Sequence, residues 1–303
     1  EDAKRIDRVR ACISLAAQSG THRERHEGSD TEGFLVELRE HASGFLAPLI
    51  KSLEVGWDAE MLRDGLVLVD LPGVGVANDE FRKVTNARLR DARAVVLVVD
   101  RSGVTEASAE QLRNTGFFTR LLHDSHDAAA DPVTLAVVMV KVDETARAAF
   151  MDERTLKGPA ARKWNDHFRE ACTNSIEFLR ANVRSELGKL VEDGPEATRA
   201  EREATITRVL QTLQVHPVSA PQYRFFLLQD EDLAPKVKSA EESRIPDLRA
   251  SLRALAAAHY ARCRERAVNA AVDAHERLRT ALVLVQAQWE RDTRAEKEAK
   301  QLR

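Results

Sequence analysis

The run of residues 66–73, Leu-Val-Leu-Val-Asp-Leu-Pro-Gly, constrains the fold of this chain more than any other stretch. Four apolar residues end at Asp70, and Pro72 and Gly73 follow closely. This pattern predicts a buried parallel strand that stops at a functional loop. Ligands of α/β sheets bind at the carboxyl ends of strands, where a carboxylate can hold Mg²⁺ and a glycine amide can approach a phosphate. The alternative interpretation is a strand that ends in an ordinary Pro-Gly turn.

Three further apolar runs predict strands of the same sheet. The first run, residues 94–99, ends at Asp100. The other two are followed by candidate site residues: residues 133–140 by Lys141 and Asp143, and residues 215–218 by Ser219 and Ala220. Continuous apolar strands that alternate with helical segments are typical of a parallel sheet covered on both faces. The sequence therefore predicts an α/β fold.

In this order the motifs resemble those of the dynamin superfamily of large GTPases. That family has Asp-x-Pro-Gly after one strand, Asn/Thr-Lys-x-Asp after a later one, and Ser-Ala after the last. The run 62–75 is most similar to the branch that contains the vertebrate nuclear germinal-centre GTPase and its microbial relatives. Residues 243–249, Ser-Arg-Ile-Pro-Asp-Leu-Arg, resemble the start of the family's closing helix. The resemblance covers residues 53 to about 258 and implies a doubly wound, mostly parallel sheet like that of P-loop GTPases.

The resemblance also implies a reaction, the Mg²⁺-dependent hydrolysis of GTP to GDP, coupled to conformational change or self-assembly. Asp70 would hold Mg²⁺ through a water, and the Gly73 amide would contact the γ-phosphate, so these two are the expected catalytic residues. Arginine and lysine residues of the following helix are expected to lie on its surface.

The expected base site lies after the third and fourth strands. Lys141 would lie along the purine, and Asp143 would accept hydrogen bonds from N1 and N2 of guanine, a donor pair that adenine lacks. The amides of Ser219 and Ala220 would donate to guanine O6. Val140 stands where the family has Asn or Thr, which removes a polar side chain that ties this loop to the phosphate loop.

The phosphate loop itself is missing from the sequence, because no Gly-x-x-x-x-Gly-Lys-Ser/Thr occurs. The one Gly-Lys pair, Gly188-Lys189, is followed by Leu190 and lies downstream of Asp70, whereas the family's phosphate loop comes first. That loop supplies the phosphate cradle, a lysine and a Mg²⁺ ligand. We expect its strand to come from a segment outside this sequence or from another chain. The alternative is a pseudo-GTPase that acts as a non-catalytic interaction scaffold through its helices.

Helical patterns surround the predicted sheet. The segment from about 150 to 213 carries apolar residues at steps of three and four, which predicts a helical hairpin inserted in the GTPase domain. We expect that domain to span residues 1–258, and residues 259–303 to begin a helical bundle or stalk. A seven-residue repeat occurs there, formed by Val268, His275, Leu282 and Trp289, with Ala271, Leu278 and Val285 three residues after the first three. These residues would form a seam along one side of a helix. The seam predicts that this helix packs against another helix, either within the chain or in a dimer.

Composition restricts the partners. The 303 residues carry a net charge of −3 and only 5% aromatic residues, so direct nucleic-acid binding is not expected. Three widely spaced cysteines predict reduced thiols and hence a cytoplasmic or nuclear location. No apolar run is long enough for a membrane span, and the sequence gives no basis for predicting membrane association. The expected partners are guanine nucleotide, the missing strand, and a second copy bound through the GTPase face or the helical seam.

Overall fold

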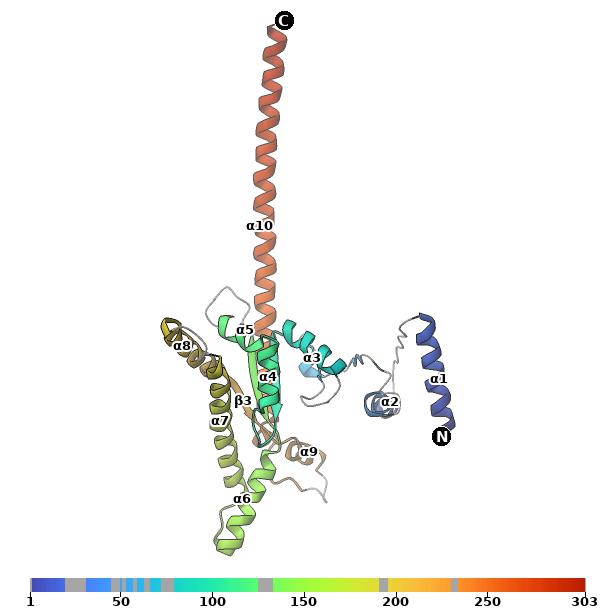
Figure 1. Cartoon of the computed structure of the whole chain (residues 1–303), viewed down its shortest axis with the longest axis vertical. Coiled ribbons are helices and arrows are strands. Elements are labelled where there is room, and N and C mark those ends of the chain that lie inside the picture. Colours follow the sequence, from blue (N-terminus) through green and yellow to red (C-terminus); the bar gives the residue numbers. More distant parts are fainter. Residues whose placement is uncertain are drawn as a thin grey trace. The chain divides into compact units, whose positions relative to one another are not determined.

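A computed structural model describes residues 2–19, 31–44, 50, 53–56, 59–62, 66–71, 79–124, 133–190, 196–229 and 234–302. The chain divides into two units, residues 1–60 and 61–303. In the first unit the described residues form two helices, α1 (Asp2–Ser19) and α2 (Thr31–Ser43). The second unit contains the sheet and the candidate site residues that the structure describes (Figure 1).

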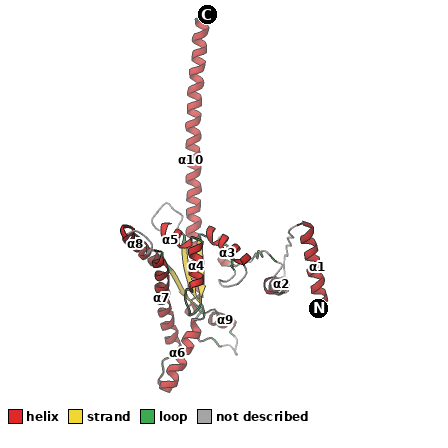
Figure 2. Cartoon of the chain, viewed as in Figure 1, coloured by secondary structure: helices red, strands yellow, loops and turns green. Residues whose placement is uncertain are grey.

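The sheet consists of three parallel strands in the order β1-β2-β3. They are β1 (Ala94–Val99), β2 (Thr134–Met139) and β3 (Gln214–Pro217). The register places Val98 beside Val138, and Val138 beside His216. These strands confirm the α/β fold predicted from three of the four apolar runs, in a molecule that is mainly helical (Figure 2).

The helices of the second unit alternate with these strands. The α-helices are α3 (Asp79–Asp91), α4 (Glu106–Asn114), α5 (Phe117–Asp124), α6 (Val142–Lys157), α7 (Trp164–Lys189), α8 (Glu196–Thr212), α9 (Ala220–Leu228) and α10 (Ile245–Gln301). Short 3₁₀ turns lie at η2 (Glu60–Leu62), η3 (Gly158–Ala160) and η4 (Glu241–Ser243). Helices α7 and α8 fall within the predicted insert and pack against each other.

The core lies between β2 and the helices on one face of the sheet. Residues of β2 from Leu135 to Met139 are all buried, because both faces of this central strand are covered. Helix α7 contributes the apolar stripe that its spacing predicts, with Phe168, Leu179, Val183 and Leu187 buried. Burial of such side chains typically contributes about 1.5–3 kcal/mol each, so this helix is a main stabiliser of the unit.

The strand predicted over residues 66–70 is not formed, so this prediction was wrong. Residues 66–71 have no strand partner among the described residues, and Val67 is 79% exposed. Leu71 alone in this segment packs against the core. The physical reason is that a strand needs a neighbour for its backbone N–H and C=O groups, and an apolar run does not supply one.

Helix α10 is a single uninterrupted helix of 57 residues (Figure 1). The predicted domain boundary after residue 258 therefore falls inside a continuous helix. None of its residues is buried, and the residues of the seven-residue seam are exposed, with Val268 at 56%. Within the described part of the chain, no second helix packs along this seam.

The turn after β1 depends on Gly103. Its φ is +74°, and its amide donates a hydrogen bond to the Asp100 carbonyl at 3.0 Å. A Cβ at this position would lie 2.7 Å from a ring carbon of Phe178 and would collide with the Asn182 side-chain oxygen. Gly116 has a similar φ of +71°, yet a Cβ there would meet nothing within 4 Å.

These two glycines give a matched pair of stability predictions. Gly116→Ala should lower the free energy of unfolding by about 1–2 kcal/mol, because only the left-handed backbone is penalised. Gly103→Ala should lower the free energy of unfolding by about 1–3 kcal/mol more than Gly116→Ala does, because its methyl group would also collide with Phe178 and Asn182 of α7. Urea unfolding of both variants measures the difference. Equal losses would show that the Phe178 contact does not matter.

Candidate functional site

The carboxyl ends of the three strands meet at one edge of the sheet. The ladder continues one residue past the strands, since Val140 N donates to Val99 O and Val218 N donates to Met139 O, both at 2.8 Å. This register aligns the segments that follow β1, β2 and β3. The candidate residues that follow β2 and β3 therefore lie at the same edge of the sheet.

Lys141 stands at this edge in the left-handed conformation, with φ 60° and ψ 28°, directly before α6. Such a backbone is unfavourable for a non-glycine residue and is often found at functional sites. The Lys141 side chain is exposed. Hydrogen bonds from the Ser102 hydroxyl and amide lower the pKa of the Asp100 carboxyl group, and the charge of Lys141 lowers it further.

Asp143 occupies the second position of α6. Its Oδ1 atom is buried and accepts no hydrogen bond from any described residue. A buried carboxylate oxygen without a donor costs about 1–3 kcal/mol or more, because it has lost its water. Asp143 as a whole is only half-buried, so part of this residue remains exposed.

Ser219 and Ala220 begin α9 at the end of β3. Ser219 is fully buried; its hydroxyl accepts from Gln222 N at 3.2 Å and its amide donates to Ser243 O at 3.0 Å. That amide is therefore already paired within the protein. Ala220 is exposed at the first position of α9, where a helix leaves its amides without intrahelical acceptors. Of the two predicted amide donors, Ala220 is the one this geometry leaves to a ligand.

Of the two residues expected on the phosphate side, the structure describes Asp70 but not Gly73. Asp70 is exposed in the segment 66–71, which is not a strand, and Gly73 lies outside the described residues. Across the described ranges, no three His, Cys, Asp or Glu side chains are placed to hold a metal ion. One carboxylate with several waters nevertheless fits the way Mg²⁺ is commonly held beside substrate phosphates.

Three residues that the sequence analysis did not select also shape this edge. Asp100 follows an apolar run, as Asp70 does, and this shared pattern would have identified it. Gln222 is buried and its side-chain oxygen accepts from Lys236 N at 2.8 Å, while Ser243 is fully buried and accepts from Ser219. No local pattern marks these last two, because their roles come from tertiary contacts.

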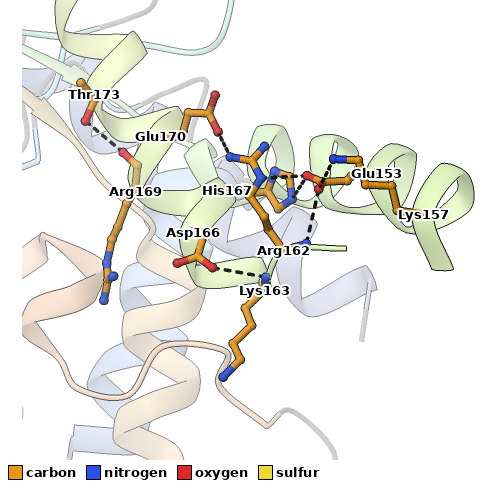
Figure 3. Close-up of polar contacts among 9 residues, drawn as sticks. All are labelled: Glu153, Lys157, Arg162, Lys163, Asp166, His167, Arg169, Glu170 and Thr173. Atoms are coloured by element: carbon orange, nitrogen blue, oxygen red, sulfur yellow. Dashed lines mark hydrogen bonds and ion pairs between the residues drawn. The ribbon is translucent and has the colours of Figure 1, made fainter. Parts of the chain in front are cut away.

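A second polar cluster joins the end of α6 to the start of α7. Glu153 accepts from Lys157 Nζ at 3.0 Å and from Arg162 Nε at 2.9 Å (Figure 3). Buried His167 places Nε2 3.1 Å from Glu153 Oε2 without a hydrogen bond to any described residue, and the contact is an ion pair only when the imidazole is protonated. Arg162 also donates to Glu170 at 2.7 Å. The four charged side chains pair with one another, so the cluster is best explained as a clasp between two helices.

A surface cavity of about 540 Å³ lies at the first turns of α7, beside this clasp. Arg162, Lys163, Arg169 and Lys238 line it. Arg162 is paired with two glutamates, and Arg169 lies 3.7 Å from Glu242, so much of the positive charge is already neutralised. The cavity therefore gives weaker grounds for a ligand site than the sheet edge does.

The clasp leads to a pH prediction. Hydrogen bonds from Arg162 and then Lys157 lower the pKa of Glu153 from 4.5 to about 2. The pKa is lower in the folded state, so this stabilisation is complete above about pH 5 and is lost as the pH falls toward 2. Glu153→Gln should flatten the pH dependence of the thermal midpoint in that window, whereas Glu177→Gln, at an exposed position of α7, should not. Parallel wild-type and Glu153→Gln profiles would contradict the clasp.

The remaining observations concern the cysteines and the membrane. All three cysteines, Cys12, Cys172 and Cys263, are free, and burial raises the pKa of Cys172 to about 11, which makes that thiol unreactive. Among the described helices, none combines the length and apolarity that a membrane crossing requires. No protein-family model matches the chain, and no curated protein or solved structure shows significant similarity to it.

Proposed function

We propose that this chain is the guanine-binding part of a dynamin-like GTPase, with its sheet forming one side of a doubly wound, P-loop GTPase-like domain. The strand order β1-β2-β3 and the positions of Lys141, Asp143 and Ala220 support this proposal. In it, the carboxyl edge of the sheet binds the base of GTP or GDP. Hydrolysis of GTP is coupled to conformational change or self-assembly.

The single observation that carries the proposal is the Oδ1 atom of Asp143, which is buried and accepts no hydrogen bond from the described part of the chain. Guanine presents N1–H and N2–H side by side, so its base can satisfy a carboxylate with two hydrogen bonds. Adenine has no such pair of donors and would leave the Asp143 oxygen unsatisfied, which disfavours it. Lys141 lies two residues away and can place its stem along the purine, while the Ala220 amide donates to the guanine carbonyl.

The phosphate side of the proposal involves Asp70 and Gly73. Asp70 would hold Mg²⁺ through a water, and the Gly73 amide would donate to the γ-phosphate. Bound Mg²⁺ neutralises charge on the β- and γ-phosphates while water attacks the γ-phosphorus. The phosphate cradle and its lysine have no counterpart in this sequence and must be supplied by another segment.

A non-catalytic scaffold is the second candidate function. Two observations favour it: the sequence has no Gly-Lys-Ser/Thr, and α10 presents exposed apolar residues along its seam, among them Leu278, Leu282 and Trp289. In this alternative, α10 binds a partner helix or a second copy, and nucleotide binding is weak or lost.

Amide hydrogen exchange in the presence of saturating GDP tests the proposed function. We expect exchange to slow at residues 140–144 and at Ala220, and to stay unchanged at the clasp between residues 153 and 170. Exchange that is unaffected at the sheet edge, or that slows only in α10, would contradict guanine binding and favour the scaffold.

A further inference from the structure

The first turn of α9 leaves a single backbone donor for a ligand. Ser219 caps this helix, since its hydroxyl accepts from Gln222 N and its carbonyl accepts from Tyr223 N, both at 3.2 Å. Pro221, at the second position, has no N–H group. The Ala220 amide has no acceptor within the helix and none among the other described residues. Because Ala220 is exposed, its N–H group is the one donor that this turn offers to a bound molecule.

Two hydrogen bonds hold this turn, one on either side of Ala220. The Ser219 amide donates to Ser243 O at 3.0 Å, and the Gln222 side-chain oxygen accepts from Lys236 N at 2.8 Å. Ser219 and Ser243 are fully buried, and Gln222 is 6% exposed. Both partners belong to the segment that leads into α10, so this segment joins the turn at two points.

The segment 236–243 is itself anchored to the rest of the unit. Val237 is buried in the core, and the Lys236 ammonium group lies 5.7 Å from the centre of the Trp164 ring. At the other end, the Ser243 hydroxyl donates to Ala240 O and accepts from Ile245 N at 3.3 Å. The segment therefore provides a fixed support for the turn that carries Ala220.

We propose that Gln222 is a positioning residue for base recognition. The hydrogen bond that its side-chain oxygen accepts from Lys236 N aims the Ala220 amide at the carbonyl oxygen of guanine. This inference rests on the proposed function, because it requires a base at the carboxyl edge of the sheet. Gln222 acts through the backbone of the turn and makes no contact with the base. A hydrogen bond weakens steeply as its angle bends, so a turn released on one side loses the aim of its donor.

Two nucleotides separate the Ala220 contact from the Asp143 contact. In 6-thioguanosine diphosphate the N1–H and N2–H groups remain for Asp143, but sulfur, a weaker acceptor, replaces the carbonyl oxygen. We expect the full-length protein to bind GDP about tenfold more tightly than this analogue. Gln222→Met keeps the length of the side chain and removes the acceptor, so it should weaken GDP binding by about tenfold and leave binding of the analogue nearly unchanged. Calorimetric titration measures the four affinities.

Two further variants test whether the acceptor oxygen is responsible. Gln222→Glu retains an oxygen that can accept from Lys236 N, so it should keep the preference for GDP within about twofold of the wild type. Gln211→Met, at an exposed position of α8, should also match the wild type. An unchanged preference in Gln222→Met, or an equal weakening of both nucleotides, would overturn the positioning role alone. A wild-type protein that bound neither nucleotide would overturn the proposed function and this inference with it.

Amide hydrogen exchange of the wild type gives a test that does not depend on the folding of a variant. A base bound to the Ala220 amide stabilises the held form of the turn and therefore the hydrogen bond from Lys236 N. Saturating GDP should slow exchange at Lys236 by about threefold or more, the thio analogue should slow it less, and the clasp between residues 153 and 170 should not change. Exchange at Lys236 that both nucleotides leave unchanged, or slow equally, would overturn the proposal.

Discussion

Asp143→Asn should transfer the base preference of this protein from guanosine diphosphate to xanthosine diphosphate. The asparagine amide donates where the carboxylate accepts, so it repels the N2–H group of guanine and suits the carbonyl that xanthine has at that position. We expect GDP to lose about 3 kcal/mol of binding free energy, roughly a hundredfold in affinity. Titration calorimetry measures the affinity of the wild type and of the variant for each of the two nucleotides.

The neighbouring residue provides the control for this switch. Glu144 is exposed on the same helical turn, so Glu144→Gln should bind GDP as the wild type does. If Asp143→Asn bound GDP with wild-type affinity, the buried Asp143 oxygen would not face the base and the proposed site would be wrong.

The chain of residues 1–303 should hydrolyse GTP no faster than buffer when it is alone. The sequence contains no Gly-Lys-Ser/Thr, so neither the β-phosphate cradle nor its lysine is present. The segment that ends at Asp70 is not paired into the sheet, so this carboxylate is not held at the site by a strand. Phosphate release from GTP, with and without the chain, measures the rate.

Turnover by this chain would contradict that expectation, provided that Asp70→Ala abolished it. The variant separates activity of the chain from activity of a contaminant, because Asp70 is the one residue expected to hold Mg²⁺. If the Asp70→Ala variant hydrolysed GTP as fast as the wild type, the activity would come from a contaminating enzyme. That result would not contradict the expected inactivity of this chain.

The sequence predicts a strand correctly where an apolar run is buried on both faces of the sheet, as in β2. Residues 135–139 are covered on both faces, and the continuous apolar run predicts this directly. The run 66–69 has the same composition, but no strand forms because pairing depends on a neighbour that the run does not contain. The α7 stripe predicted its helix, whereas the seam of α10 could not predict that no described helix packs along it.

The candidate site was predictable to the extent that parallel strands place their carboxyl ends together. Lys141 and Asp143 therefore share an edge with Ser219 and Ala220, as expected. The pairing of the Ser219 amide with Ser243 was not predictable, because it depends on how residues 234–243 return to the sheet. A tertiary contact of this kind leaves no pattern in a local stretch of sequence.

The central claim is that Asp143 selects guanine, and a comparison of GDP with ADP tests it most directly. Calorimetric titration of the full-length protein, which includes the phosphate loop, with each nucleotide in Mg²⁺ buffer isolates the base, since the two ligands share their ribose and phosphates. The account predicts that GDP binds roughly a hundredfold more tightly than ADP. Equal affinities would contradict it.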